Sequence, residues 1–251
     1  MSIIVTGGAS GIGKAIATLA HGRGAHVGVL DINEEKGEAL IKSLGVRSVF
    51  QTGNVLDEKS MIDAFEYFGS SLPEINGCVA SAGMLPTREP IENTTLNEFK
   101  EVMDNHISGT FVTTKIAGRI MENGKGGSIV TLGSILSLRP GPVLGYGAGK
   151  AAVVNLTQAL AVQWAKKNIR INAMCPGWVD TPFIRKQEED GRDLTPILNT
   201  TPMNRLVKAE EIAELAYFLL SPASSALTGS VIVADCGISL AGGYMPYGGI
   251  P

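Results

Sequence analysis

The sequence predicts one α/β domain, built on a parallel sheet with helices on both of its faces. Short apolar runs rich in β-branched residues alternate regularly with segments of helical period along the 251 residues. No shift of composition and no internal repeat marks a boundary, so residues 1–251 are expected to form a single domain.

Each element follows from its own pattern. Strands are expected at 2–6, 25–31, 46–51, 75–81, 127–133, 169–175 and 230–235, where the apolar runs are short. Helices are expected at 11–23, 34–44, 57–71, 96–121, 146–167 and 208–221, where apolar residues recur with helical spacing. The long stretch 176–207 is expected to be irregular, since Pro182, Pro196 and Pro202 interrupt it. A connection of that length usually has a function, and we expect a substrate lid.

The composition excludes several classes of protein. With 44% hydrophobic residues, 18% charged residues and a net charge of −3, the chain is typical of globular proteins without a nucleic-acid partner. No apolar run reaches the roughly 20 residues that span a bilayer. The start, MSIIVTGG, lacks the features of a signal peptide, so we expect a cytoplasmic protein without a membrane contact.

The cysteines and histidines show no metal-binding pattern. Three cysteines without a CxxC pair favour free, mostly buried thiols in a reducing compartment. The three histidines also lack the spacing of metal ligands, so they are expected to be structural or surface residues. No metal site is therefore predicted. The cysteines are Cys78, Cys175 and Cys236, and the histidines are His21, His26 and His106.

A glycine-rich loop joins the first strand to the first helix. In TGGASGIG, residues 6–13, Gly7, Gly11 and Gly13 permit positive φ and close backbone approach, and the helix start offers free N–H groups to a phosphate. A tight turn has the same appearance, but a strand before the loop and a helix after it favour a dinucleotide site.

Asp31 ends the second strand. It lies 20 residues beyond Gly11, about the spacing at which an acid meets the adenine ribose hydroxyls. A carboxylate there repels a 2′-phosphate, and no arginine follows it, since the next residues are Ile32, Asn33 and Glu34. NAD is therefore favoured over NADP, although the same aspartate could serve only as a cap at the strand end.

Tyr146 and Lys150 lie in GYGAGK, residues 145–150, at the start of a helical segment. Positions i and i+4 share one face of a helix, so the two side chains are neighbours. An ammonium beside a phenol favours the phenolate. We expect Lys150, helped by the positive charge of an oxidised nicotinamide, to lower the pKa of Tyr146 from its free value of about 10 toward the working pH of an acid/base catalyst. The small residues between them are expected to let cofactor and substrate approach closely. Alone, the pair could also be a chance surface spacing.

The TGxxxGxG spacing together with YxxxK resembles the short-chain dehydrogenase/reductases, and the resemblance covers nearly the whole chain. The matching stretches are TGGASGIG at 6–13, SAG at 81–83, Asn105, GSI at 133–135, YGAGK at 146–150, NIRIN at 168–172, PGWVDT at 176–181 and TGSVIVADCG at 228–237. The resemblance implies a doubly wound, Rossmann-type sheet of seven parallel strands, with the cofactor at the carboxyl edge of the strands.

The resemblance also implies catalytic roles. Tyr146 is the general acid/base, and Lys150 sets its ionisation and binds the nicotinamide ribose. The Ser134 hydroxyl holds the substrate oxygen, and Asn105 kinks its helix and holds a water beside Lys150. Ser134 could instead be only a strand-end cap, and Asn105 could instead be a solvent-facing amide.

The cofactor contacts that the resemblance implies come from the loops at one sheet edge. They are Gly7, Ser10, Gly11, Ile12, Gly13, Asp31, Ile32, Asn54, Val55, Ser81, Ala82, Gly83, Tyr146, Lys150, Pro176, Gly177, Val179 and Thr181. Three positions depart from the family pattern. Asn54 replaces the usual aspartate near the adenine, Ser81 in ASAG replaces an asparagine that stabilises the central sheet, and Cys236 interrupts the closing DGG-like turn.

The substrate is predicted only as a class. The segments that line the substrate in this family are mostly apolar here, which favours a compact hydrophobic or alicyclic ketone or alcohol over a sugar, although the same residues could cover core. They include Met84, Leu85, Ile135, Leu136, Leu138, Val143, Leu144, Trp178 and Phe183. Arg139 and Arg185 could meet an acidic group or simply be solvated. The tail 241–251 could pack on a neighbouring subunit or be a free end.

The leading interpretation is an NAD-dependent secondary alcohol dehydrogenase or ketone reductase. The alternatives are an NADPH-dependent oxoacyl-carrier reductase, against which Asp31 argues, and a non-catalytic dinucleotide-binding sensor, which would usually have lost the tyrosine or the lysine. A homotetramer is expected, because the helices at 96–121 and 146–167 carry apolar residues beyond one buried face. Among them are Val153, Val154, Leu156, Leu160 and Trp164.

Overall fold

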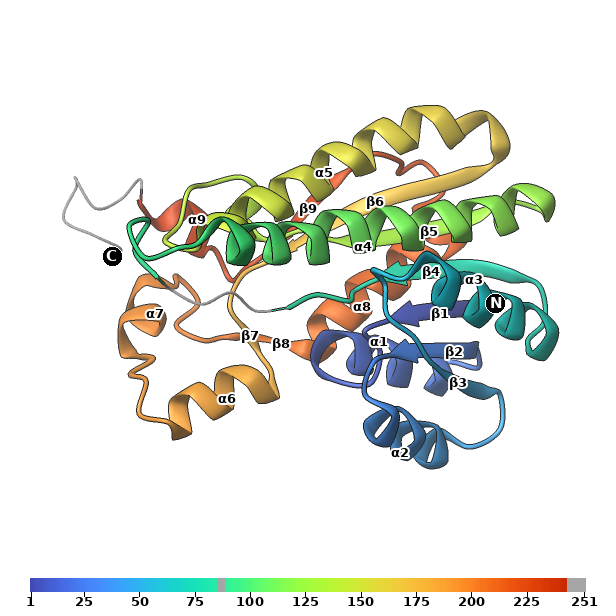
Figure 1. Ribbon diagram of the computed structural model, residues 1–251, viewed down its shortest axis with the longest axis horizontal. Helices are drawn as coiled ribbons and strands as arrows, with labels where there is room; N and C mark the ends of the chain where they lie inside the picture. Colours follow the sequence, from blue (N-terminus) through green and yellow to red (C-terminus); the bar gives the residue numbers. More distant parts are fainter. Residues whose placement is uncertain (85–88, 243–251) are drawn as a thin grey trace.

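The centre of the molecule is a seven-stranded parallel sheet, which confirms the predicted fold class (Figure 1). The computed structural model describes residues 1–84 and 89–242. The strand order is β3-β2-β1-β4-β5-β6-β9. The strands are β1 (Ser2–Thr6), β2 (His26–Asp31), β3 (Ser48–Thr52), β4 (Ile75–Ala80), β5 (Gly127–Leu132), β6 (Ile169–Pro176) and β9 (Val231–Ala234). Each lies within two residues of its predicted range.

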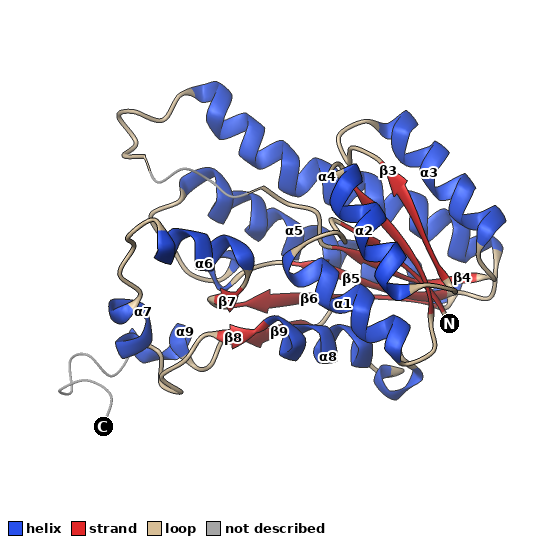
Figure 2. Cartoon of the chain, turned by 90° about the horizontal axis from the view of Figure 1, so that it is seen from below, coloured by secondary structure: helices blue, strands red, loops and turns tan. Residues whose placement is uncertain are grey.

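Helices cover both faces of this sheet (Figure 2). They are α1 (Gly11–Gly22), α2 (Glu34–Leu44), α3 (Glu58–Ser71), α4 (Leu96–Asn123), α5 (Leu144–Trp164) and α8 (Ala209–Leu220). One core cluster joins the sheet to α1, α2 and α8, and a second joins it to α3, α4 and α5. A sheet buried on both faces needs continuous apolar strands, and β1 is buried at all five positions.

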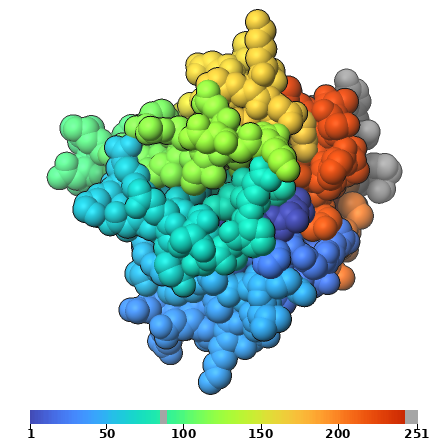
Figure 3. Space-filling view, turned by 90° about the vertical axis from the view of Figure 1, so that its right-hand side faces the viewer, coloured from blue at the N-terminus to red at the C-terminus, as the bar shows by residue number. Residues whose placement is uncertain are grey.

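The strand order reverses at β1, which has β2 on one side and β4 on the other. Figure 3 views the side of the molecule that carries the N-terminus, where the dark-blue start of the chain lies among later segments, in keeping with this central position. All seven strands run parallel, so their carboxyl ends meet at one edge. Open α/β sheets bind ligands at such an edge, beside the point of reversal.

The stretch 176–207 is not irregular, and here the prediction was wrong. It holds β7 (Val179–Asp180), α6 (Pro182–Glu189) and α7 (Thr195–Thr200), and β7 pairs in parallel with β8 (Val207–Lys208). Pro182 and Pro196 lie in the first turns of α6 and α7. Proline is favoured at that position, because its missing N–H has no helical partner there. Two of the three prolines therefore begin helices instead of interrupting the chain.

Part of the apolar excess on α5 is explained within the chain itself. Val153, Val154 and Trp164 are buried in its core, which corrects the expectation that they remain for another subunit. Leu156 and Leu160 are only partly buried. Among the described residues, no helix is long and apolar enough to cross a membrane. The tail expected at 241–251 lies outside the described residues from 243 onward, and 238–241 form a short helix, α9 (Ile238–Ala241).

Candidate active site

The glycine loop between β1 and α1 forms a cradle of backbone. Gly7 and Gly11 have positive φ values of 64° and 51°, which side-chain-bearing residues rarely adopt. Ser10 precedes the helix, but its side chain makes no capping hydrogen bond. A Cβ on Gly13 would lie 2.2 Å from the Gly7 carbonyl oxygen. No side-chain cap therefore uses the first N–H groups of the helix. A Cβ in the loop would crowd its backbone, so the glycines leave these N–H groups accessible, as the binding of a pyrophosphate requires.

Replacing Gly13 by alanine is expected to weaken NAD binding at least about tenfold, a loss of ~1.4 kcal/mol. The new methyl group would overlap the Gly7 carbonyl, so the loop must shift. Gly22 lies in the same helix with nothing within 4 Å of its Cβ position, and Gly22→Ala is the matched control. Calorimetric titration with NAD checks both variants. Unchanged affinity in Gly13→Ala would show that this loop does not hold the dinucleotide.

Asp31, at the end of β2, points its carboxylate toward the glycine loop. One carboxylate oxygen accepts a hydrogen bond from the Ala9 N–H at 3.0 Å, and the other accepts one from the Asn33 N–H at 3.0 Å. Ile32, the next residue, is exposed. A negative charge fixed beside the loop fits an adenosine ribose with free hydroxyls.

The turn after β4 closes onto the same loop. The Ser81 hydroxyl donates a hydrogen bond to the Thr6 carbonyl at 2.5 Å, so this serine joins β4 to β1 despite being shorter than the asparagine it replaces. A Cβ on Gly7 would lie 2.6 Å from the Ala82 Cα, so the two turns are in contact. Gly83 follows, and leads to Met84 at the edge of the described residues.

The remaining cofactor candidates divide into two groups. On one side, Asn54 uses its side-chain oxygen to accept from the Leu56 N–H, and Val55 is buried. On the other, Val179 and Thr181 follow β6, and the Thr181 methyl group lies 3.7 Å from the Cβ position of Gly11. The loops after β1 and β6 therefore meet across the sheet edge.

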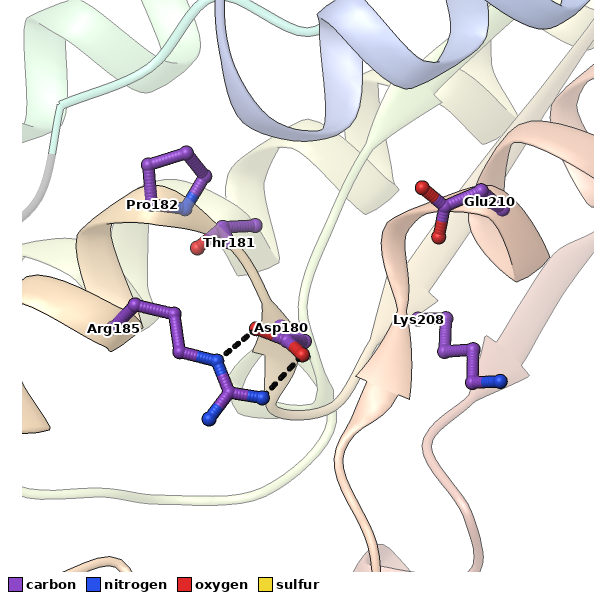
Figure 4. A pocket seen from close by; sticks show the side chains of 6 residues that line it. All are labelled: Asp180, Thr181, Pro182, Arg185, Lys208 and Glu210. Atoms are coloured by element: carbon purple, nitrogen blue, oxygen red, sulfur yellow. Dashed lines mark hydrogen bonds and ion pairs between the residues drawn. The ribbon is translucent and has the colours of Figure 1, made fainter.

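An open hollow of about 410 Å³ adjoins Thr181 (Figure 4). Arg185 points into it and pairs with Asp180, and it also pairs with Glu188. With two carboxylates as partners, Arg185 is already neutralised, which favours its solvated role over contact with an acidic substrate. The other lining residues are Pro182, Lys208 and Glu210.

Ser134, Tyr146 and Lys150 gather at the carboxyl ends of β5 and β6. Ser134 follows β5, is buried, and accepts a hydrogen bond from the Leu136 N–H at 3.1 Å. The Lys150 ammonium is 6% exposed and donates to the Leu132 carbonyl at 2.7 Å. It lies 5.7 Å from the centre of the Tyr146 ring. The one-turn spacing on α5 therefore brings the phenol and the ammonium to one buried centre, as predicted.

The acidity of Tyr146 departs from the prediction. Burial raises its pKa, and the hydrogen bond with Ser134 acts in the opposite direction without overcoming it. Burial also lowers the pKa of Lys150 to about 8. Lys150 alone therefore does not lower the pKa of Tyr146, because the low dielectric disfavours both charged forms, and the part of the expectation that rests on the nicotinamide charge stays a prediction.

The glycines of GYGAGK face other parts of the protein, not open space. A Cβ on Gly145 would lie 3.2 Å from the Phe99 carbonyl, and one on Gly149 would lie 3.2 Å from the His106 Cβ. Both contacts are with α4, so these two glycines let α4 and α5 approach closely. This replaces the expectation that they make room for cofactor and substrate.

Asn105 lies in α4 and holds the neighbouring loop. Its side-chain oxygen accepts a hydrogen bond from the Met84 N–H at 2.7 Å. The side chain is therefore used to fix the backbone just after the β4 turn, and is not a solvent-facing amide. Of the expected substrate wall, Ile135 and Leu136 are half-buried beside Ser134, and Leu85 lies outside the described residues.

Sequence comparisons identify relatives along nearly the whole chain. A family model described as enoyl-(acyl carrier protein) reductase matches residues 7–239. A 2,5-dichloro-2,5-cyclohexadiene-1,4-diol dehydrogenase of Sphingobium indicum is 35% identical over 241 residues, which cover 95% of this chain and 96% of the relative. A cis-4-hydroxycyclohexanecarboxylate dehydrogenase of Sinomonas cyclohexanicum is 32% identical over 237 residues, with coverages of 93% and 94%.

Solved structures share the fold of this chain. The crystal structure of levodione reductase superimposes with a TM-score of 0.90 and 28% sequence identity. The match covers 96% of this chain and 98% of the other. At that coverage, the likeness extends over nearly the whole of both chains.

Proposed function

The chain belongs to the short-chain dehydrogenase/reductase family, and from this premise we propose that it is an NAD-dependent dehydrogenase for a small alicyclic alcohol or ketone. Membership makes it an oxidoreductase that acts on CH–OH groups. The choice of NAD, the alicyclic substrate and the residue roles are the proposal.

One observation carries the proposal. Tyr146 and Lys150 share a buried centre with Ser134, at the same sheet edge as the glycine loop and Asp31. A non-catalytic dinucleotide-binding protein has no need of a buried ammonium beside a half-buried phenol, since burying the ammonium is costly. The acid/base pair next to a nucleotide cradle supports a proton transfer coupled to hydride transfer.

When bound, the nicotinamide would supply the hydride acceptor or donor, held by the glycine loop, Lys150 and Thr181. In the oxidation direction, Tyr146 accepts the alcohol proton while the Ser134 hydroxyl donates a hydrogen bond to the substrate oxygen. Because burial holds the phenol protonated in the free protein, the phenolate forms only when further positive charge lies beside it. Cofactor binding and the ionisation of Tyr146 are therefore coupled.

The alicyclic substrate class rests on two lines of support. The two curated relatives are named for a cyclohexadiene diol and a hydroxycyclohexanecarboxylate. In this chain, the half-buried Ile135 and Leu136 beside Ser134 suit a compact apolar ring. Arg185, paired with two carboxylates, gives no separate support for an acidic substrate.

The preference for NAD predicts a specific switch. Asp31→Ala combined with Ile32→Arg is expected to shift the cofactor preference from NAD toward NADP. The double substitution removes the charge that repels a 2′-phosphate and adds one that attracts it. Asp31→Asn, which removes only the charge, is the control and should narrow the difference in affinity between the two cofactors without making NADP the preferred one. Fluorescence titrations with NADH and NADPH measure both. Equal affinity of the wild-type protein for the two cofactors would contradict the proposed role of Asp31.

The function is tested by turnover of the purified protein with NAD. The panel holds cyclohexanols, cyclohexane diols, hydroxycyclohexanecarboxylates, hexitols and, with NADPH, an acyl-carrier thioester. Turnover highest on alicyclic alcohols supports the proposal. Preference for the thioester favours the oxoacyl-carrier alternative, and cofactor binding without any turnover favours the sensor. A homotetramer and a cytoplasmic location belong to the same proposal, and light scattering at micromolar concentration tests the first.

A further inference from the structure

Ser137 joins the turn that carries Ser134 to the helix that carries Lys150. Its side-chain oxygen accepts a hydrogen bond from the Ser134 N–H at 3.0 Å and donates one to the Lys150 carbonyl at 2.8 Å. A carbonyl only accepts hydrogen bonds and an N–H only donates them, so the single hydroxyl proton of Ser137 points to Lys150. The hydroxyl is therefore held in one orientation, with the backbone of a proposed catalytic residue on either side.

The turn around Ser134 is closed locally before it is tied to α5. After β5 the chain forms the short 3₁₀ helix Ile135–Ser137, in which the Ser134 hydroxyl accepts from the Leu136 N–H at 3.1 Å. These contacts fix Ser134 only relative to its own neighbours in the chain. The bond from Ser137 to the Lys150 carbonyl reaches 13 residues further along the chain, so it relates the turn to α5.

The bridge lies where water is largely excluded. Ser134 and Lys150 are buried, and Ser137 is half-buried. A Cβ on Gly133 would lie 3.1 Å from the Ser137 Oγ and 2.7 Å from the Cys175 Sγ, so the absence of a side chain at Gly133 leaves room for the bridge. Loss of the Ser137 hydroxyl would leave the Ser134 N–H without its partner, and the turn would have to shift to pair it again.

We propose that Ser137 is a positioning residue, which holds the Ser134 hydroxyl in its place beside Tyr146 by tying the Ser134 backbone to that of Lys150. This inference rests on the proposed function. Ser134 and Tyr146 belong to different elements, so their relative position depends on contacts between the turn and α5. Ser137 supplies such a contact through backbone atoms on both sides, and it acts on the reaction only through Ser134.

The pH dependence of oxidation reports on this geometry. Burial raises the pKa of Tyr146, and its hydrogen bond with Ser134 lowers that pKa without overcoming burial. In the described part of the chain, the other titratable groups that face Tyr146 are Lys150 on the same helix, Cys175 on β6 and His106 on α4. If Ser134 moves away, the pKa of Tyr146 should rise further. Oxidation needs the phenolate, so its rate should then rise only at higher pH.

The test replaces Ser137 by alanine. We expect kcat for alcohol oxidation to fall at least about tenfold, with the NAD dissociation constant within about twofold, since Ser134 is displaced while the nucleotide cradle is unchanged. The rise of the oxidation rate with pH should move to higher pH. Ser137→Thr, which keeps the hydroxyl, should restore both kcat and the pH profile.

The matched control is Ser128→Ala. Ser128 lies at the amino end of β5, and its hydroxyl also donates to the backbone of a neighbouring helix, at the Leu219 carbonyl, 2.8 Å away. This substitution removes an equivalent hydrogen bond at the far end of the same strand. It should therefore leave kcat and the pH profile unchanged.

A positioning role and a general packing role give different results in a double substitution. In a Ser134→Ala background, Ser137→Ala should lower kcat by less than about twofold more, since the hydroxyl that Ser137 positions is already gone. A further loss as large as in the wild-type background, or an unchanged pH profile in Ser137→Ala alone, would overturn the proposal. If Ser137→Ala does not fold, Ser137→Cys, which keeps the shape and weakens both hydrogen bonds, is held to the same expectations.

A readout without turnover separates this inference from the proposed function. Hydrogen exchange of the Ser134 amide, measured by NMR, should become at least about tenfold faster in Ser137→Ala, because the amide loses its acceptor. In Ser128→Ala it should be unchanged. Wild-type exchange of that amide in Ser137→Ala would overturn the positioning role, whatever the activity. A wild-type protein without turnover on the panel would instead contradict the proposed function.

Discussion

Tyr146→Phe is expected to lower kcat by about 10²–10⁴-fold, the range typical for loss of a general acid or base. The substitution keeps the ring that packs against His106 and removes only the hydroxyl. NAD affinity should remain within about twofold, because the phenol is not the main anchor of the dinucleotide. Initial rates of alcohol oxidation and a fluorescence titration with NADH measure the two effects separately.

The control for this change is Tyr67→Phe, since Tyr67 is partly exposed on α3 and far from the carboxyl edge of the sheet. A further expectation concerns pH. Because burial raises the pKa of Tyr146 and oxidation needs the phenolate, the rate of oxidation should rise with pH in the wild type. The residual rate of Tyr146→Phe should lack that rise. Near-wild-type turnover by Tyr146→Phe would show that the tyrosine is not the proton acceptor.

Lys150→Met is expected to abolish measurable turnover and to weaken NAD binding as well. Methionine keeps the unbranched shape of the buried side chain but removes its charge and its hydrogen bond to the Leu132 carbonyl. Without the ammonium, no fixed positive charge remains beside the phenol, and the proposed ribose contact is lost. Lys115→Met, at an exposed lysine paired with Glu58, is the control. Retention of both turnover and affinity would contradict the role of Lys150.

The same substitution should stabilise the ligand-free protein at neutral pH. The pKa of Lys150 is lowered from 10.5 to about 8 in the folded state, so folding disfavours its charged form. The cost is present in full below pH 8, shrinks between about pH 8 and 10.5, and is absent above that range. Its size is on the order of 3 kcal/mol. Urea unfolding at pH 7 and pH 10 measures this change. Between these pH values, the free energy of unfolding of the wild type should increase relative to that of Lys150→Met.

The sequence was sufficient for the sheet and for the pairing of Tyr146 with Lys150. Seven strands were predicted correctly because each has a short apolar run, such as Ile3–Val5 in β1, that stands out against its surroundings. Tyr146 and Lys150 were paired correctly because helical spacing alone fixes which side chains are neighbours. Both inferences need only local geometry.

The errors arose where tertiary environment decides. Pro182 and Pro196 were interpreted as interruptions, although the chain around them supplies helices that a proline can begin. The pKa of Tyr146 was predicted to fall because the sequence shows the neighbouring charge but not the burial that outweighs it.

The small β7–β8 ladder fixes the chain just after β6 independently of the segment that lies between its two strands. Val179 pairs with Val207 and Asp180 with Lys208, and the Val207 N–H donates to the Trp178 carbonyl at 2.8 Å. The ladder clamps the two ends of the intervening segment, so the position of Thr181 beside the glycine loop does not depend on how long that segment is. Doubling the length of a closed loop costs only about 0.6 kcal/mol. Insertions and deletions between residues 183 and 205 should therefore leave Thr181 in its place beside the glycine loop.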